Sequence, residues 1–200
     1  MPITNLHQTK RGQAAIAAIV ALSVGGYVVL PSGYKVHDDT ALAVTYLTKD
    51  WEGRRLKSYL DRIAKPPRWT VCDGDTTDVG PDTVETEAGC DKRLAQKMEA
   101  DYRPPLQKCV LNWDRQPLAW RGVMLDFAWN TGVRTACNSG GVKEVNAAQH
   151  EGRKPDFSKA CENLTLYTNA GGVFIKGLAL RHGMGDATRI GDGELCRNAK

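Results

Sequence analysis

The chain has 200 residues, of which 42% are apolar, so it can form one domain with a hydrophobic core and a short additional segment. Its 27 basic and 23 acidic residues give a net charge of +4, and no basic run is longer than two residues. This mild excess favours anionic partners such as cell-wall polymers or membrane surfaces, and the short basic runs argue against a nucleic-acid groove.

The first predicted element is an apolar helix near the N-terminus. Residues 12–30 contain no charged side chain and follow Lys10 and Arg11. As a helix, this segment would be about 28 Å long, close to the roughly 30 Å hydrocarbon core of a bilayer. The basic pair predicts that residues 1–11 stay in the cytoplasm and that the chain after the segment is exported.

This segment is weakly apolar for an anchor because much of it is Gly, Ala or Ser. Ala17, Ala21 and Gly25 recur at every fourth position, which predicts a face for helix packing. A cleaved signal peptide is the alternative, although its apolar core is usually shorter and no A-x-A cleavage site follows here. We expect an uncleaved span, a linker over residues 31–39 and a domain over residues 40–200.

The cysteines agree with export. All six are widely spaced and form no C-x-x-C pair, which argues against a zinc ribbon or a thioredoxin-type site. The four histidines form no ligand pair at helical spacing, so no metal site is predicted. An even number of widely spaced cysteines predicts disulfides, which form outside the reducing cytosol. Free cysteines in the core are the alternative.

A helix is predicted over residues 38–53, because apolar residues recur there at helical spacing between an Asp cap and Gly53. Residues 54–61 and 69–72 alternate loosely on either side of a turn-rich stretch, which predicts a small hairpin. Residues 74–89 form a polar loop.

Helical patterns dominate the rest of the chain. Pro104 and Pro105 should stop the first of these helices, and Pro117 and Gly132 should bound the second. The outline is an α+β domain with one small β element near its start. Helices are expected over residues 87–103, 117–130, 142–150 and 156–168.

Glu52, Asp61 and Thr70 are candidate catalytic residues around the predicted hairpin. Glu52 would lie at a helix C-terminus, where unpaired carbonyl groups disfavour negative charge and should raise its pKa. A carboxylic acid that stays protonated near neutral pH suits general-acid cleavage of a glycosidic bond. Asp61 would remain ionised, and Thr70 would help to hold a water. The alternative is that the two carboxylates merely face solvent.

Three ordered motifs resemble those of phage-type lysozymes. WEGRRLKSYLD, residues 51–61, with the following Thr70 resembles the family's catalytic segment, in which E-G precedes an Asp or Cys and then a Thr. LDFAWNTG, residues 125–132, resembles its F-x-x-N-x-G helix end, and residues 167–181 resemble its Y-A-G-G…G-L-x-x-R segment. The resemblance covers residues 40–196. With the weak N-terminal span, the chain is similar to endolysins that bear a signal-arrest-release segment.

The resemblance implies a lysozyme-like α+β fold with a small β lobe, a larger helical lobe and a cleft between them, preceded by one transmembrane helix. It implies hydrolysis of the β-1,4 linkage between N-acetylmuramic acid and N-acetylglucosamine of peptidoglycan, without a metal or cofactor. Glu52 would be the general acid, and Asp61 with Thr70 would place and activate water. A lytic transglycosylase, which needs no activated water, and a catalytically inactive membrane-anchored protein that binds the wall are the alternatives.

Further expectations come from the same resemblance. Asn130, Tyr167 and Asn169 would contact the sugar, although Asn130 is equally well explained as a helix C-cap. The loop between Asp61 and Thr70 is longer than usual, and Asp73 and Asp75 stand where many relatives have a Gly-x-Gly-His sequence. The implied disulfides are Cys72–Cys90, Cys109–Cys137 and Cys161–Cys196.

The resemblance also implies a location and a partner. The host secretion machinery would export the chain, which would then sit in the inner membrane facing the periplasm. After release into the periplasm it would act as a monomer on peptidoglycan and cause host cell lysis. The freed segment would pack against the enzyme through its Ala/Gly face.

Overall fold

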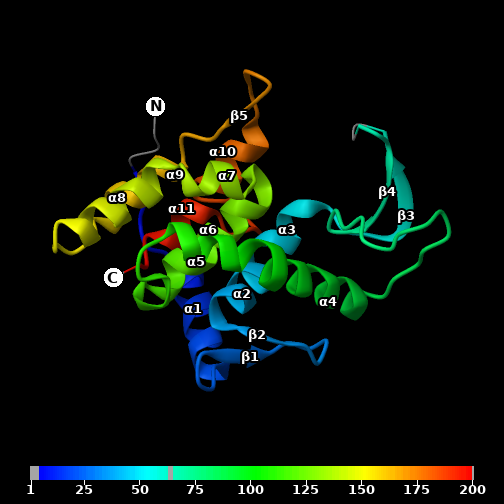
Figure 1. Ribbon diagram of the computed structural model, residues 1–200, viewed down its shortest axis with the longest axis horizontal. Helices are drawn as coiled ribbons and strands as arrows, with labels where there is room; N and C mark the ends of the chain where they lie inside the picture. Colours follow the sequence, from blue (N-terminus) through cyan, green and yellow to red (C-terminus); the bar gives the residue numbers. More distant parts are fainter. Residues whose placement is uncertain (1–4, 63–64, 200) are drawn as a thin grey trace.

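A computed structural model describes residues 5–62 and 65–199 of the chain. It has a helical lobe around α6 (Leu118–Thr131) and a smaller β lobe made by the antiparallel hairpin of β3 (Arg55–Asp61) and β4 (Arg68–Cys72). Figure 1 shows the two lobes at opposite ends of α4 (Glu87–Lys97). The predicted α+β class and the predicted hairpin are therefore confirmed.

Helix α6 is the centre of the helical lobe. Every residue from Ala119 to Ala128 is buried, because other helices surround α6 on all sides. Trp120 and Phe127 are fully buried, so the tryptophan belongs to the core and does not stack on a sugar. Pro117 and Gly132 bound this helix as predicted.

The helical run that leads to Glu52 ends at Gly53, as predicted. Gly53 adopts a left-handed conformation with φ 63° and ψ 54°, which glycine accepts without strain. The N-cap is His37 and not an aspartate; Asp38 and Asp39 occupy the first turn, where their charge favours the helix N-terminus. The run consists of α2 (Asp38–Ala43), the π-helical η1 (Val44–Thr48) and α3 (Lys49–Glu52).

The prediction that Pro104 and Pro105 stop a helix is wrong. After α4 the chain continues through the π-helical η2 (Met98–Tyr102) into α5 (Arg103–Cys109). Both prolines lie in the first turn of α5, where the backbone N–H of a residue has no partner within the helix. They therefore begin a helix.

The predicted span over residues 12–30 is not one helix. Helix α1 covers Lys10–Leu22, and the chain then turns at Gly25 and Gly26, whose φ angles are 61° and 83°. Between residues 5 and 62 and between 65 and 199, no helix combines the length and apolar character that crossing a bilayer requires. The predicted linker also folds, because β1 (Tyr27–Val29) pairs with β2 (Lys35–His37) around a turn at residues 30–34.

Helix α1 packs against the helical lobe, but through a face other than the predicted one. Gly12, Ala15 and Ile19 are buried, whereas Ala17, Ala21 and Gly25 are exposed. The buried residues lie three and four positions apart, so they line one side of the helix. Position along the helix, and not small size alone, determines which residues make the contact.

The remaining elements complete the helical lobe, and their boundaries follow local caps. Helix α8 begins earlier than predicted because the Ser139 side chain accepts a hydrogen bond from the Val142 N–H, and Asp156 caps α9 in the same way. Helix α9 ends at Leu164, short of the predicted end at residue 168. These elements are η3 (Trp113–Arg115), α7 (Val133–Cys137), α8 (Gly140–His150), α9 (Phe157–Leu164), β5 (Asn169–Ala170), β6 (Val173–Phe174), α10 (Lys176–His182) and α11 (Asp192–Cys196).

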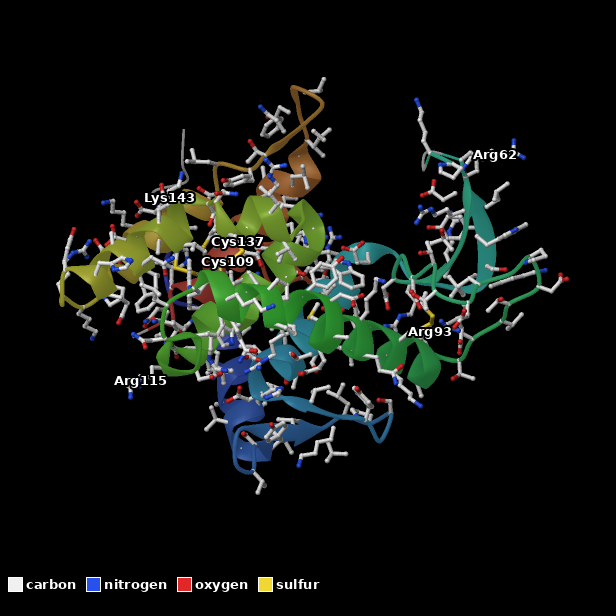
Figure 2. The ribbon with its side chains drawn as sticks, in the orientation of Figure 1. Arg62, Arg93, Cys109, Arg115, Cys137 and Lys143 are labelled. Carbon is white, nitrogen blue, oxygen red and sulfur yellow. A yellow bond between two sulfur atoms is a disulfide. The ribbon has the colours of Figure 1, made fainter. Side chains whose placement is uncertain are left out.

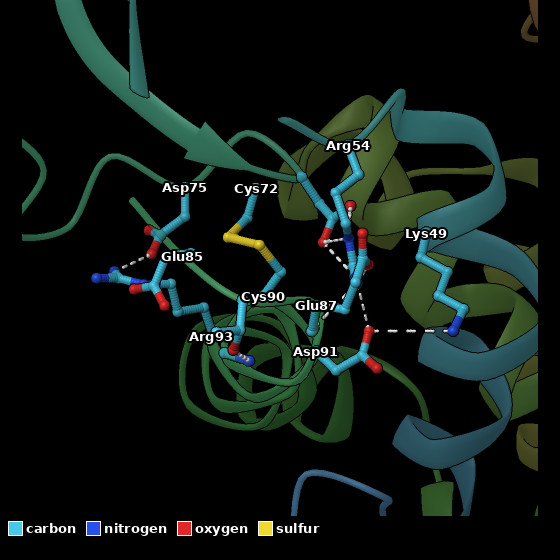
Figure 3. The surroundings of a disulfide bond; sticks show 12 residues. Lys49, Arg54, Cys72, Asp75, Glu85, Glu87, Cys90, Asp91 and Arg93 are labelled. Atoms are coloured by element: carbon cyan, nitrogen blue, oxygen red, sulfur yellow. Dashed lines mark hydrogen bonds and ion pairs between the residues drawn. A yellow bond between two sulfur atoms is a disulfide. The ribbon is translucent and has the colours of Figure 1, made fainter. Parts of the chain in front are cut away.

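Three disulfides join elements that are distant in sequence, and they are the pairs that the resemblance implied. Cys109–Cys137 links α5 to α7 inside the helical lobe, as the side-chain view shows (Figure 2). Cys161–Cys196 links α9 to α11. Cys72–Cys90 ties β4 to α4 and so fastens the β lobe to the connecting helix (Figure 3).

Candidate active site

Glu52 is the last residue of α3, at the point where the chain leaves the helical lobe for the hairpin. Its side chain is only 22% exposed. Burial raises the pKa of Glu52, while the neighbouring Arg181 opposes this rise and Asp126 and Asp73 add to it. The predicted direction of the shift is therefore correct, but burial is its main cause.

Arg181, on α10, connects Glu52 to the interior. Its Nη1 donates a hydrogen bond to Glu52 Oε1 at 2.6 Å. Its Nε and Nη2 donate to the two carboxylate oxygens of Asp126, on α6, at 3.1 and 2.8 Å. Asp126 is fully buried, and Arg181 is nearly so. Sequence reasoning gave neither residue a role, although Arg181 closes the G-L-x-x-R motif.

A second buried group lies behind Arg181. His182 Nδ1 is 2.7 Å from Asp192 Oδ2, on α11, and His182 Nε2 is 3.1 Å from Asn130 Oδ1. Burial lowers the pKa of His182 to about 4, so its imidazole is neutral at neutral pH. Asn130 is not the helix C-cap, which is Gly132. Its side chain instead faces the buried histidine.

The hairpin brings Asp61 and Thr70 onto one face. Asp61 pairs with Arg68 and Thr70 pairs with Tyr59, and residues two apart on a strand share a face. Thr70 is buried, and its Oγ1 donates a hydrogen bond to the Arg68 carbonyl at 3.3 Å. This pairing is present although the loop between Asp61 and Thr70 is longer than usual.

Asp73 and Asp75 hold the β lobe in position. Asp73 Oδ2 accepts a hydrogen bond from Arg54 Nη2 at 2.7 Å, and Asp75 Oδ2 accepts one from Arg93 Nη1 at 2.8 Å. These ion pairs lie on either side of the Cys72–Cys90 disulfide (Figure 3). Asp73 therefore connects the end of the hairpin to Arg54, just before β3, and Asp75 connects it to Arg93 on α4.

The other predicted sugar contacts are Asn169, on β5, and Tyr167, two residues before it. The rings of Tyr167 and of Phe127, in the core, pack edge to face with their centroids 4.9 Å apart. Asn169 is exposed and pairs with Phe174 in the short β5–β6 hairpin. Figure 1 shows this hairpin as a projection from the helical lobe, apart from the β3–β4 hairpin.

In the part of the chain that the structure describes, no three His, Cys, Asp or Glu side chains could together hold a metal ion. A cavity of about 610 Å³ lies between α4 and the loop after β4, and its lining includes Asp75 and Arg93 but not Glu52, Asp61 or Thr70. The candidate site is therefore identified by the environment of Glu52.

Comparisons with known proteins identify sequence relatives. The family described as "Phage lysozyme" matches residues 49–184, which include Glu52, Asp61, Thr70 and Arg181. A protein named "SAR-endolysin" from bacteriophage PS119 is 31% identical over 133 residues, which cover 65% of this chain and 71% of that relative.

Solved structures share the fold at low sequence identity. The endolysin from Escherichia coli O157:H7 phage FAHEc1 has a TM-score of 0.58 and 17% identity, with 80% of this chain and 91% of that chain covered. The muramidase domain of SpmX from Asticaccaulis excentricus has a TM-score of 0.55 and 15% identity, with 89% of this chain and 93% of that chain covered. The active form of the P1 phage endolysin Lyz has a TM-score of 0.52 and 18% identity, with 86% of this chain and 88% of that chain covered. These likenesses show a lysozyme-like α+β fold.

Proposed function

The chain belongs to the phage lysozyme family and is a glycoside hydrolase of the lysozyme type, and from this premise we propose that Glu52 is its general acid. The proposed reaction cleaves the β-1,4 linkage between N-acetylmuramic acid and N-acetylglucosamine in peptidoglycan. The observation that carries the proposal is the position of Glu52, a largely buried carboxyl group whose burial raises its pKa. Such a group holds a proton at a pH at which an exposed glutamate has lost it.

The reaction needs a proton on the leaving oxygen and a water at the sugar carbon. Glu52 would deliver the proton, and the bond to the leaving oxygen would break as positive charge develops on the sugar ring. Asp61 and Thr70 would position and activate the water, and their place on one face of the hairpin supports this shared role. Asn130, Tyr167 and Asn169 are proposed sugar contacts, with Asn169 the most accessible of the three.

The N-terminal segment suggests how the enzyme would be controlled. Residues 12–30 are uncharged and follow a basic pair, and the relative from bacteriophage PS119 is named a SAR-endolysin. We propose that this segment spans the host inner membrane after export by the secretion machinery. Release into the periplasm would let the segment fold as α1 and β1, with β1 pairing with β2 just after it. The released monomer would then cut the wall and lyse the host.

Replacement of Glu52 by glutamine tests the assignment. The amide has nearly the shape of the acid but cannot donate the proton, so clearing of outer-membrane-permeabilised cells should slow by at least about 10²–10⁴-fold. The melting temperature should show that the variant is folded. A folded variant with near-normal activity would exclude Glu52 as the acid.

Product analysis distinguishes the enzymatic alternatives. Hydrolysis leaves reducing N-acetylmuramic acid ends, whereas a lytic transglycosylase leaves anhydro-muramic ends. Mass spectrometry of the solubilised fragments should therefore detect reducing ends. A parent protein that is folded but releases no fragments at all would instead be a wall-binding protein.

A further inference from the structure

The ionic groups behind Glu52 are arranged around one guanidinium. Arg181 donates to Glu52 through Nη1 and to Asp126 through Nε and Nη2. Asp126 lies in the buried stretch of α6 and is itself fully buried, so this carboxylate has no access to solvent and needs a charged partner. A single arginine thus serves two carboxyl groups, one in the interior and one at the proposed active site.

We propose that Asp126 is a positioning residue for the general acid. It accepts the Nε and Nη2 hydrogen bonds of Arg181 and neutralises the charge of this arginine. Glu52 is then left with a single hydrogen bond, from Arg181 Nη1. This inference rests on the proposed function, in which Glu52 is the acid. Without Asp126, the full positive charge of Arg181 would act on Glu52 and would favour its ionised form. An acid that is already ionised cannot protonate the leaving oxygen.

The other buried groups do not replace the charge of Asp126. Asn130 Oδ1 faces His182 Nε2, so Nε2 must carry the hydrogen and Nδ1 must accept one. The partner of Nδ1 is Asp192, which therefore donates as the protonated acid. Burial and the nearby charge of Asp126 both raise the pKa of Asp192, which agrees with this assignment. The His182–Asp192 pair is then neutral as a whole.

The balance of charges follows from this assignment. Burial works to raise the pKa of Asp126, but the charge and hydrogen bonds of Arg181, together with a hydrogen bond from Thr48, outweigh burial and lower it. Asp126 and Arg181 therefore form a neutral pair beside Glu52. From the β lobe, Asp73 also raises the pKa of Glu52, and from η2 Tyr102 faces the same carboxyl group. Asp126 provides the negative charge that directly contacts Arg181 in the core.

The pH dependence of wall cleavage tests this role. In Asp126→Asn, the side chain can still accept a hydrogen bond from Arg181 but carries no charge, so the pKa of Glu52 should fall. The alkaline limb of the pH–activity profile should move to lower pH by about 1 unit or more. Below that limb the activity of the variant should approach that of the parent, because Glu52 is protonated in both. A purely structural defect would lower activity by the same factor at every pH.

Asp192→Asn is the matched control, since it makes the same change in the same buried cluster but removes a group that is already neutral. Its alkaline limb should keep the parent's position. The proposal is wrong if folded Asp126→Asn keeps the limb of the parent, or if Asp192→Asn shifts the limb equally. Asp126→Glu, which keeps the charge, should restore the limb.

A measurement on the parent protein covers the case in which the variants do not fold. Carbon NMR of the side-chain carboxyl groups should show Glu52 losing its proton at the pH of the alkaline limb while Asp126 stays ionised throughout. Titration of Asp126 at that limb would overturn the proposal. If the parent does not cleave peptidoglycan at all, the proposed function fails, which is a different outcome from an unshifted limb.

Discussion

The two lobes carry the proposed catalytic groups in different ways. The helical lobe presents Glu52 from the edge of a large hydrophobic core and holds it through buried Arg181 and Asp126. The β lobe presents Asp61 and Thr70 from a hairpin whose own buried cluster consists of Val71, Cys72 and Cys90. The burial of apolar surface therefore stabilises the first lobe far more than the second.

The β lobe compensates with covalent and ionic links to α4. The Cys72–Cys90 disulfide fastens the end of β4, and Arg54 bridges Asp73 and Asp91 at 2.7 Å each. These links constrain where the hairpin stands relative to α4. Changes in the helical lobe should therefore alter the chemistry of Glu52, whereas changes in these links should alter the position and stability of the hairpin.

Removal of the Cys72–Cys90 disulfide should have a large effect on stability, and this effect should be concentrated in the β lobe. The disulfide closes a loop of 18 residues, and in the chain-entropy model its loss costs about 3 kcal/mol. Because the lobe has so few other buried contacts, this loss should open the hairpin locally. In a Cys72→Ala, Cys90→Ala variant, amide hydrogen exchange should accelerate in β3 and β4 and stay slow in α6.

The Cys109–Cys137 disulfide provides the comparison. It closes a loop of 28 residues inside the helical lobe, so the entropic cost of its loss is similar. Its removal should lower the melting temperature but should not open β3 and β4 selectively. Equal acceleration of exchange in both lobes in the first variant would show that the hairpin does not depend on its disulfide.

The pH dependence of stability should reveal the protonation state of the buried His182–Asp192 pair. In Asp192→Asn, His182 has no acid partner, and burial, which lowers its pKa to about 4 in the parent, should still hold this pKa below its usual value of about 6.5. The unfolded chain then binds more protons between these values, so stability is present above pH 6.5 and is lost as the pH falls toward 4. The loss should reach about 3 kcal/mol, and denaturant titrations at several pH values measure it.

The parent should lack this particular loss, since Asp192 brings its own proton into the folded state and the pair keeps the same number of protons as in the unfolded chain. A parent and an Asp192→Asn variant that lose stability in parallel between pH 6.5 and 4 would contradict the neutral pair. Stability measurements alone thus test whether Asp192 is protonated and His182 neutral behind Arg181.

Local signals in the sequence predicted much of the fold. Gly53 ended the helix, the turn-rich stretch formed a hairpin, and Pro117 and Gly132 bounded α6, because each of these effects acts within a few residues. The two prolines of α5 were misinterpreted because the same residue type can end one helix or begin the next. Only the path of the following chain distinguishes the two outcomes.

The buried part of the site was not predictable in the same way. Asp126 and Arg181 are 55 positions apart, and an aspartate on a mostly apolar helix gives no indication of its partner. The N-terminal segment presents a related problem. Its composition is compatible with a membrane span, yet in the structure Gly25 and Gly26 turn the chain and α1 packs against α2 and α11.

The smallest effect is expected at the contact between α1 and α11. Arg11 donates to both oxygens of buried Glu194, at 2.7 and 2.6 Å, and to the carbonyl of Asp186 at 2.7 Å. Because Arg11 is 37% exposed, water can partly replace it, and Arg11→Gln should cost roughly 1–2 kcal/mol. That cost should weaken the attachment of α1 without altering the lobe beneath it. Limited proteolysis of the folded protein, and amide exchange along α1, would measure the change.

Lys10→Gln is the control for this contact, since it removes a charge from the adjacent position, where the side chain is exposed. It should leave proteolysis of α1 unchanged. In Arg11→Gln, the alkaline limb of the pH–activity profile should also stay in place. Arg11 contacts Glu194, whereas the residue of the same short helix that contacts buried His182 is Asp192. A shifted limb in Arg11→Gln would instead show that the attachment of α1 sets the ionisation of Glu52, and the two regions would then be coupled through α11.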